Sequence, residues 1–442
     1  MTKVGFISLG CSKNLVDTEV MLKKLHDAGF EITPDETEAE IIIINTCGFI
    51  ESAKQESIDN ILDAEKLKEW GKCRHIVATG CLVERYREEV MSELPEVDAL
   101  VGVGSLSDIV DACKAVMRGE KYTSFKDKNT SPLGGERILT TDDHTAYLKI
   151  AEGCDNKCTY CAIPLIRGKF RSRTIEYIVS EARDLESLGV KELNLIAQDT
   201  SRYGLDIYGK YSLAELVREI TAKTDIPWIR LLYCYPDKIT DELIEEMRTN
   251  PRLLKYMDIP VQHISDSVLT RMNRHGGKKL ICETVKKLRE RVPGIVLRTT
   301  AMVGFPGESE EDFVELCEFI KETKFDRFGA FTYSEEEGTS AALLDGKIDE
   351  QTKQDRYDIL MQTQLTVTEE QNAKKIGLTY TVLCDGFDTV AEIYYGRTYA
   401  DAPDVDGRVY FTSKKRVAPG EFINVRITEA LDYDLVGERV DG

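Results

Sequence analysis

Residues 147–161 read YLKIAEGCDNKCTYC, so that Cys154, Cys158 and Cys161 follow a short apolar segment with the spacing CxxxCxxC. Thiolates this close together are typical ligands of soft metals. A structural zinc site normally takes four protein ligands, and the neighbouring sequence offers no second CxxC and no HxxxH pair. Three thiolates instead suit a 4Fe-4S cluster with one iron left open; a buried cysteine cluster without metal is the alternative.

The chain around this motif repeats a strand-and-helix pattern. A helical pattern lies between most neighbouring strands, which we expect at 147–150, 192–196, 228–232, 256–259, 296–299 and 327–331. Six such repeats predict a parallel (β/α) barrel, complete or partial, over residues 145–374. Reactive groups in such barrels lie at the carboxyl ends of the strands, and the cysteine motif directly follows the first of them.

A smaller α/β domain is expected ahead of the barrel, over residues 1–122. Short apolar runs are predicted to be strands at 4–8, 41–45, 75–78 and 99–101. They alternate with amphipathic segments that are predicted to be helices at 14–28, 52–69 and 83–93. This alternation predicts a doubly wound domain with a parallel sheet.

A linker and a third domain complete the predicted α/β multidomain architecture. Residues 123–144 are polar, contain proline and paired glycines, and are predicted to be a linker. A helix is expected at 351–375. The short β runs that follow predict a small all-β barrel over residues 375–442, with strands at 380–384, 391–394, 408–411 and 422–427.

Three cysteines of the first domain share one setting. Cys11, Cys47 and Cys81 each follow a predicted strand. Because the carboxyl ends of parallel strands form one crevice, these side chains are expected to converge. The alternative is that each is an ordinary small core residue. The other six cysteines share no spacing and are interpreted as core or incidental thiols: Cys73, Cys113, Cys234, Cys282, Cys317 and Cys384.

Composition limits the kinds of partner and compartment. The 442 residues carry 58 basic and 78 acidic side chains, a net charge of −20, which opposes binding to a phosphate backbone. The sequence shows no secretory leader and no apolar run of about 18 residues. We therefore expect a soluble, cytoplasmic protein whose 12 cysteines stay reduced.

The cysteine motif, with Tyr160 beside its last cysteine, resembles the signature of the radical S-adenosylmethionine (SAM) superfamily. A second cysteine trio ahead of the barrel and a small β domain similar to the TRAM module after it resemble the methylthiotransferase family over nearly the whole chain. The resemblance implies two 4Fe-4S clusters. One, on Cys154, Cys158 and Cys161, would cleave SAM to a 5′-deoxyadenosyl radical. The other would donate a methylthio group and would be held by Cys11, Cys47 and Cys81.

Three segments are most similar to the branch of that family that modifies the β-carbon of an aspartate in ribosomal small-subunit protein S-twelve. They read SLGCSKNLVD at 8–17, IPLIRGKFRSR at 163–173 and DIPVQH at 258–263. The resemblance also implies an external one-electron donor, a flavodoxin or ferredoxin. Other branches modify tRNA adenosines, and this is the first alternative function. A non-catalytic iron-sulfur protein or a zinc-bound interaction module is the second.

Charge and strand position add two expectations. Residues 376–442 hold seven basic and twelve acidic side chains, which favours a basic protein substrate over RNA. At the barrel mouth, side chains that could hold SAM or the substrate are expected from Gln198 after the second strand, Arg230 on the third and Gln262 after the fourth. An ordinary role at a strand end fits each of these three residues equally well.

Overall fold

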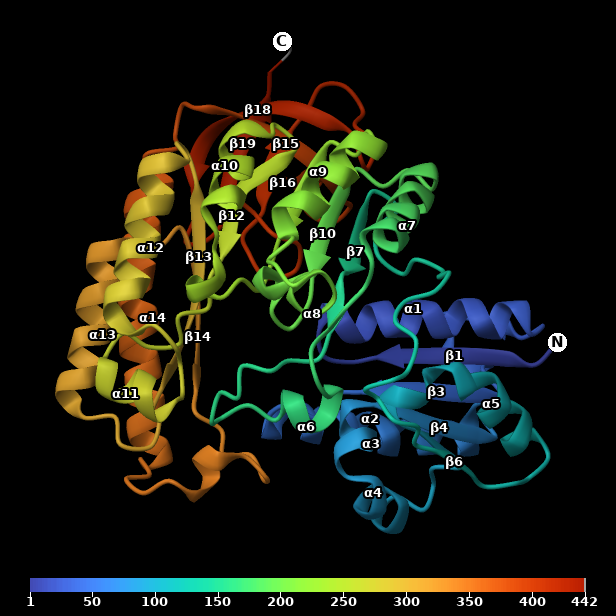
Figure 1. The fold of residues 1–442 in the computed structure, drawn as a ribbon. Coiled ribbons are helices and arrows are strands. Elements are labelled where there is room, and N and C mark those ends of the chain that lie inside the picture. Colours follow the sequence, from blue (N-terminus) through green and yellow to red (C-terminus); the bar gives the residue numbers. More distant parts are fainter. Residues whose placement is uncertain (441–442) are drawn as a thin grey trace.

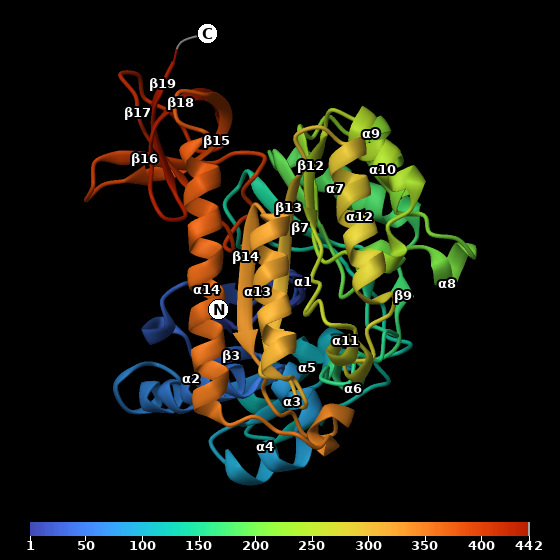
Figure 2. The same cartoon turned by 90° about the vertical axis from the view of Figure 1, so that its left-hand side faces the viewer.

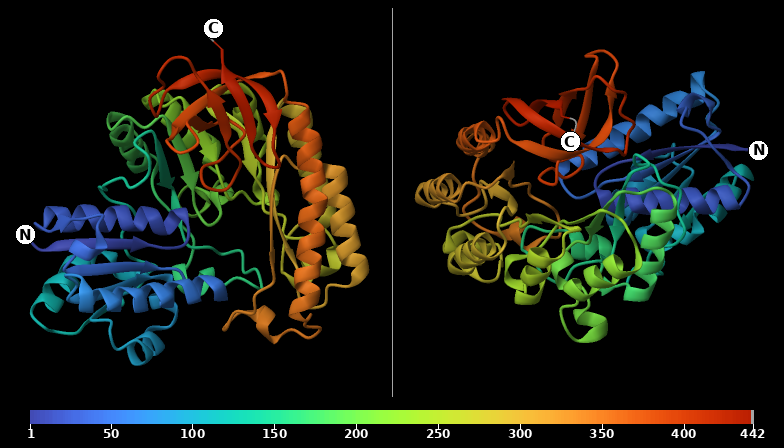
Figure 3. Two further views of the ribbon diagram at one scale, coloured as in Figure 1. Left: turned by 180° about the vertical axis from the view of Figure 1, so that it is seen from behind. Right: turned by 90° about the horizontal axis from the view of Figure 1, so that it is seen from above.

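The structure is a computed structural model that describes residues 1–440. Figure 1 shows three lobes: an N-terminal α/β lobe in blue and teal, a central sheet with its helices in green to orange, and a small red β barrel. Seen from behind in Figure 3, the red barrel sits at the end of the central sheet that lies away from the N-terminal lobe. No helix within residues 1–440 has the length and apolar character needed to cross a membrane.

The N-terminal lobe is built on a six-stranded parallel sheet with the order β2-β1-β3-β4-β5-β6. The strands are β1 (Lys3–Ser8), β2 (Glu31–Ile32), β3 (Ile41–Thr46), β4 (His75–Gly80), β5 (Ala99–Val101) and β6 (Tyr122–Ser124). One face packs against α1 (Ser12–Asp27) and α5 (Ile109–Met117). The other packs against α2 (Glu51–Trp70), α3 (Cys81–Arg85) and α4 (Arg87–Glu93). Helices on both faces confirm the doubly wound prediction.

Local details of this lobe differ from the sequence prediction. The edge strands β2 and β6 were not expected, because two or three residues are too few to show a strand period. The helix predicted at 83–93 is two helices, α3 and α4, because the backbone at Tyr86 leaves the helical region.

The central sheet is an open barrel of six parallel strands. In spatial order they are β14 (Arg327–Thr332), β13 (Val296–Val303), β12 (Leu253–Asp258), β11 (Trp228–Leu231), β10 (Glu192–Ile196) and β7 (Thr145–Lys149). Because β7 and β14 are the two edges, the barrel is partial. A short antiparallel pair, β8 (Ala151–Glu152) and β9 (Arg171–Ser172), brackets the cysteine motif.

Helices cover the outer face of this sheet, as Figure 2 shows for the edge at β14, which faces the viewer there. The long ones are α7 (Ile175–Ser187), α9 (Leu213–Lys223), α10 (Asp241–Thr249), α12 (Gly277–Arg291), α13 (Glu310–Thr323) and α14 (Glu350–Ala373). Three shorter helices lie in the connections between strands: α6 (Ile163–Arg167), α8 (Leu205–Tyr208) and α11 (Asp266–Arg271). Along β10, Leu193 and Leu195 belong to the core beneath these helices, whereas Ile196 belongs to a separate cluster with residues of the C-terminal lobe. Strand β10 is therefore buried on both faces.

The C-terminal lobe is a closed five-stranded barrel with the order β15-β16-β17-β19-β18. Its strands are β15 (Thr379–Asp388), β16 (Ile393–Arg397), β17 (Val409–Thr412), β18 (Phe422–Ala430) and β19 (Leu435–Arg439). This confirms the all-β barrel. Strand β19 was not expected, because its sequence LVGER is short and mixes glycine with charged residues.

A segment of the C-terminal lobe, residues 397–406, closes the amino-terminal end of the central sheet. The phenol of Tyr256 donates to Asp406 over 2.6 Å, and the guanidinium of Arg327 binds Asp401. The Arg230 side chain, fully buried, donates to the backbone oxygen of Tyr399 over 2.8 Å. With this end filled, the carboxyl end of the strands is where a ligand can enter the partial barrel.

Candidate active site

The first cysteine trio gathers at the carboxyl edge of the N-terminal sheet. Cys11 is the N-cap of α1 after β1, Cys47 follows β3, and Cys81 is the first residue of α3 after β4. Strands β1 and β3 are neighbours whose connections run to opposite faces, which makes this edge the topological switch point where doubly wound folds bind ligands. Burial raises the pKa of Cys81 to about 12; the nearby Arg167 opposes this rise, and Cys11 and Cys47 contribute to it.

One buried amide, that of Asn14, ties the three cysteine-bearing loops together. Its Nδ2 donates to the backbone oxygen of Leu9 over 2.9 Å and to that of Thr46 over 3.0 Å. Its Oδ1 lies 3.8 Å from the Sγ of Cys81. Each contact fixes the backbone or sulfur of a different loop. Asn14 therefore sets the relative positions of the three cysteines.

The loops of this trio are also packed too tightly for larger residues. Gly10 has a φ of +87°, and a Cβ atom placed there would lie 2.9 Å from both the Cβ and the Sγ of Cys47. Only glycine accepts this conformation and this approach at no cost. The hydroxyl of Ser57 on α2 accepts from the Cys47 amide and donates to its carbonyl, both over 2.9 Å. Cys47 is thus held in place on two sides.

The second trio lies in a single loop at the carboxyl end of the first barrel strand. Cys154 and Cys158 are buried, and Cys161 is half-buried. Burial raises the pKa of Cys154 to about 11, and the neighbouring Cys158 adds to the rise. Burial likewise raises the pKa of Cys161, with further contributions from Cys158 and Cys154. The three thiols therefore share one site.

Contacts to five separate segments hold this loop. Asn156 donates to Asp199 over 2.8 Å, and Lys238 binds both of these residues. The Thr159 amide donates to the Met272 oxygen over 3.0 Å, and the Thr159 oxygen accepts from Ala341 over 2.8 Å. The Cys154 amide donates to the oxygen of Gly168. A loop without regular structure is thereby fixed by the sheet around it.

Neither trio has the geometry of a single zinc ion. Thiolates 2.3 Å from a tetrahedral zinc ion lie about 3.8 Å from each other. Within residues 1–440, a group of three potential ligands whose atoms all lie within 4.8 Å of one another is formed by Asp142, His144 and Asp385. Neither cysteine trio meets that criterion. Cysteine thiolates are the usual ligands of 4Fe-4S clusters.

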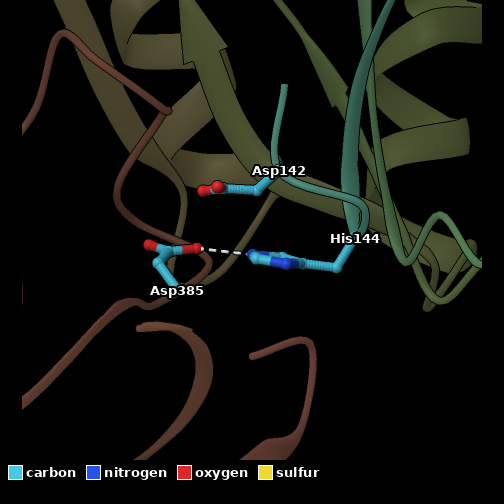
Figure 4. A group of neighbouring side chains, drawn as sticks. All are labelled: Asp142, His144 and Asp385. Atoms are coloured by element: carbon cyan, nitrogen blue, oxygen red, sulfur yellow. Dashed lines mark hydrogen bonds and ion pairs between the residues drawn. The ribbon is translucent and has the colours of Figure 1, made fainter. Parts of the chain in front are cut away.

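Figure 4 shows that Asp142, His144 and Asp385 join the linker to the C-terminal barrel. The Nε2 of His144 lies 2.9 Å from Asp385 Oδ1. Both oxygens of Asp385 also accept from Arg397, over 2.9 and 3.0 Å. Because Arg397 neutralises the Asp385 carboxylate, we interpret these three residues as a structural contact between the linker and the C-terminal barrel.

The two trios face each other across the boundary between the N-terminal lobe and the barrel. Cys81 packs in one small apolar cluster with Ala162, the residue after Cys161, and with Ile166 of α6. Arg167, the last residue of α6, donates to the Sγ of Cys81 over 3.3 Å. Side chains of the loop that carries the second trio thus touch a cysteine of the first.

The residues predicted at the barrel mouth divide into two groups. Tyr160 packs edge-on against Phe305, with ring centroids 6.4 Å apart, in an apolar cluster beside the second trio. Gln198 and Gln262 each leave a buried Oε1 atom without a protein partner. Gln262 also has a φ of +69°, a strained backbone conformation of the kind that clusters at ligand sites. These features suit a bound polar ligand.

Arg230 does not lie at the mouth. It bonds Glu192 through Nε and Nη2, over 3.0 and 2.9 Å, at the opposite end of the sheet. The sequence prediction placed it by its strand alone. Strand β11 ends at Leu231, but the long Arg230 side chain turns toward the segment that fills the amino-terminal end. Its charge is fully used in structural contacts.

Sequence reasoning gave no individual role to three contact residues of the site: Lys13, Asn14 and Arg167. The Nζ of Lys13 lies 2.9 Å from the ring centroid of Tyr233, across the lobe boundary. All three residues stand inside the quoted segments 8–17 and 163–173. Their position close to a cysteine in the sequence could have indicated a role at the site. Their contact partners, however, lie in other segments and are known only from the fold.

Comparison with known proteins agrees with this architecture. Residues 3–102 match the uncharacterized protein family UPF0004, residues 148–320 the radical SAM superfamily and residues 376–440 the TRAM domain. A protein of Clostridium botulinum (strain Eklund 17B / Type B) named ribosomal protein uS12 methylthiotransferase RimO is 50% identical over 439 residues, covering 98% of this chain and 97% of the relative. The chain belongs to the RimO family of radical SAM methylthiotransferases. Its cofactors are SAM and two 4Fe-4S clusters.

Other RimO relatives extend the match to the whole length. A protein of the same name from Desulforamulus reducens is 48% identical and covers 99% of both chains. Among solved structures, the radical SAM methyltransferase TsrM from Kitasatospora setae, with cobalamin and a 4Fe-4S cluster bound, superposes with a TM-score of 0.58 at 14% identity, over 78% of this chain and 74% of that one. This likeness shows a shared fold.

Proposed function

We propose that this enzyme adds a methylthio group to the β-carbon of an aspartate in ribosomal protein uS12. In this proposal Cys154, Cys158 and Cys161 hold the cluster that cleaves SAM, and the cluster on Cys11, Cys47 and Cys81 supplies the methylthio group. When bound, the clusters provide the electron that reduces SAM to a 5′-deoxyadenosyl radical and the site that carries the transferable sulfur. The chain itself provides binding, orientation and exclusion of water.

The observation that carries the proposal is the contact of Cys81, from the first trio, with the segment that directly follows the second trio. Cys81 of the first trio packs on Ala162, the residue after the last cysteine of the second. A radical formed at one site and a sulfur carried at the other must both reach a single carbon atom. Two separate iron-sulfur sites with an electron-transfer role alone would not need buried amide oxygens without a protein partner, such as the Oε1 atoms of Gln198 and Gln262.

Each domain has its own part in this proposal. Residues 1–122 would carry the sulfur-donating cluster, residues 145–374 the radical chemistry, and residues 375–442 substrate contacts, with 123–144 as the linker. Gln198 and Gln262 would hold SAM through their unpartnered oxygens, and Tyr160 with Phe305 would form a wall that keeps water from the radical. Arg230 would support the sheet and would not touch SAM.

The uS12 substrate is supported by the names of the relatives and by charge. The relatives from both organisms are named for this ribosomal protein. The C-terminal lobe carries seven basic and twelve acidic residues, so that it repels a nucleic acid backbone and attracts a basic protein. We further propose a cytoplasmic location and a flavodoxin or ferredoxin as the electron donor.

The test offers both substrate classes to one enzyme. The reconstituted protein is incubated with SAM, reductant, sulfide, a peptide containing the uS12 aspartate loop and a tRNA anticodon stem-loop, and both are read by mass spectrometry. We expect the methylthio mass gain on the peptide alone. A mass gain on the RNA alone would support methylthio transfer as the reaction but would contradict uS12 as the substrate. A peptide with asparagine at the target position is the control, since it keeps the loop and changes only the modified residue.

A further inference from the structure

A buried arginine crosses from the barrel into the N-terminal lobe. The side chain of Arg167 is 3% exposed. Its Nη2 donates to the Sγ of Cys81 over 3.3 Å and to the Oδ1 of Asn14. We propose that Arg167 is a positioning residue that holds the Cys81 sulfur by a charge-assisted hydrogen bond and thereby raises the reduction potential of the N-terminal cluster. This inference rests on the proposed function, because it requires a cluster on the first trio.

The guanidinium is fixed by partners on its other side. Its Nη1 binds one oxygen of Asp17 and lies 3.4 Å from Glu152. Lys149 binds the same two carboxylates. Two cations and two carboxylates balance, so the group needs no further counter-ion in its buried setting. The planar fork of arginine can therefore direct an N–H at Cys81 with little freedom to turn away.

A hydrogen bond to a cluster sulfur has a predictable electrostatic effect. Reduction adds negative charge to the cluster and its thiolates, and a donor on a thiolate stabilises that charge. Burial strengthens the effect, because both Cys81 and Arg167 are shielded from water. Loss of the donor should move the midpoint potential to a more negative value. Contacts of this kind around metal ligands also orient them.

The same network reaches the site proposed for SAM. Glu152, which lies beside Arg167, accepts a hydrogen bond from Gln198 Nε2 over 2.6 Å. A continuous set of buried polar contacts therefore runs from Cys81 through Arg167 and Glu152 to Gln198. Arg167 is placed where it touches the first trio directly and the second site through a single carboxylate.

The first test measures potential in a full-length chain with Cys154, Cys158 and Cys161 all replaced by alanine, so that the N-terminal cluster is alone. We expect Arg167→Gln to shift its midpoint to a more negative value and Arg167→Lys to restore part of the shift. Arg171→Gln is the matched control. Arg171 is an arginine of the next segment that donates to the backbone oxygens of Ser131 and Lys128, and its loss should leave the potential unchanged.

The outcomes separate the inference from the function beneath it. A parent chain that binds no iron would overturn the ligand assignment of the proposed function, and the inference with it. A loaded parent whose midpoint is unchanged in a loaded Arg167→Gln variant would overturn the inference alone. An equal shift in Arg171→Gln would also overturn it, since the effect would then be one of general charge.

A second measurement examines the parent chain with Arg167 in place, so that the outcome that decides it does not depend on how the Arg167 variants fold. The same chain is produced with arginine labelled with 15N in the guanidinium only, and the reduced cluster is examined by pulsed electron paramagnetic resonance. We expect a weak 15N coupling that persists in Arg171→Gln and disappears in Arg167→Lys. A loaded, reduced cluster without this coupling in the parent chain would overturn the inference.

Discussion

The two cysteine trios each offer three thiol groups, but the chain brings the three cysteines together in different ways. The second lies within the eight residues 154–161, whereas the first is spread over residues 11–81 and three strand ends. Each also has an arginine near one of its sulfurs, Arg167 at Cys81 and Arg274 near Cys158. The loop trio depends on contacts that hold one segment, and the dispersed trio depends on the register of a sheet. This difference predicts how each fails.

The largest effect is expected from the loop trio. Cys158→Ala should reduce 5′-deoxyadenosine formation to background and abolish methylthiolation, because SAM cleavage needs the cluster that we propose this thiolate holds. Iron content should fall by about half, since the first trio is intact. The product is measured by liquid chromatography after reduction with dithionite. Cys234→Ala, which removes a buried thiol of the same barrel outside the trio, should keep both activities.

Replacing a cysteine of the dispersed trio should separate the two reactions. Cys47→Ala should abolish methylthio transfer while 5′-deoxyadenosine still forms, because the radical site lies in another domain. The measurement pairs 5′-deoxyadenosine with the mass of the uS12 peptide in one reaction. Loss of both products with a loaded second cluster would mean that the trios do not have separate roles. Cys113→Ala, a buried thiol of the same lobe, is the control and should lose neither product.

A third comparison concerns two asparagines, one beside each cysteine trio. Asn14→Ala should weaken the N-terminal cluster by about 10- to 100-fold in iron affinity, the usual effect of losing a group that orients metal ligands. Asn156→Ala should do the same to the barrel cluster only, because Asn156 joins its loop to Asp199 and Lys238. Chelator titration of the two clusters, each isolated by alanine replacement of the opposite trio, gives the affinities.

Asn60→Ala provides the control for this pair. Asn60 lies on α2, and its amide bonds only the backbone of its own helix, at Glu56. Its replacement should leave both affinities unchanged. If Asn14→Ala weakened both clusters equally, the amide would act on the whole chain and not on one site.

The same contrast explains how far sequence reasoning could reach. The loop trio could be predicted from the sequence because the cysteine spacing and the preceding strand lie in one short segment. The dispersed trio was readable only after three strands were recognised, because Cys11, Cys47 and Cys81 share a setting and not a spacing. Six barrel strands and four of the five C-terminal strands were predicted, since strongly apolar runs bounded by turns identify buried strands.

Contacts made by long polar side chains could not be predicted from the sequence. Arg230 was expected at the mouth because of its strand, but its guanidinium reaches the opposite end, where Glu192 and the Tyr399 oxygen accept its hydrogen bonds. Arg167 shows the converse, since its partner Cys81 lies in a different domain. Strand position sets where a Cα atom lies, but the end of a long side chain is set by partners that only tertiary structure supplies.

The smallest expected effect concerns the boundary that keeps the trios together. Glu336 of the barrel is 2% exposed and accepts from Arg85 of the N-terminal lobe over 2.7 Å, with Lys54 at 3.3 Å. Glu336→Gln removes the charge but not the shape, and leaves two cations less well paired. We expect a loss of about 1–3 kcal/mol in the free energy of unfolding.

Transfer should suffer more than radical formation in this variant, because only transfer needs both lobes in register. We expect methylthio transfer to slow a few-fold while the rate of 5′-deoxyadenosine formation stays the same. Glu335→Gln is the neighbouring control: Glu335 is exposed and pairs with Lys347, and such surface pairs contribute little. An equal slowing of both reactions in Glu336→Gln would show that the boundary supports the radical site itself and not the transfer between sites.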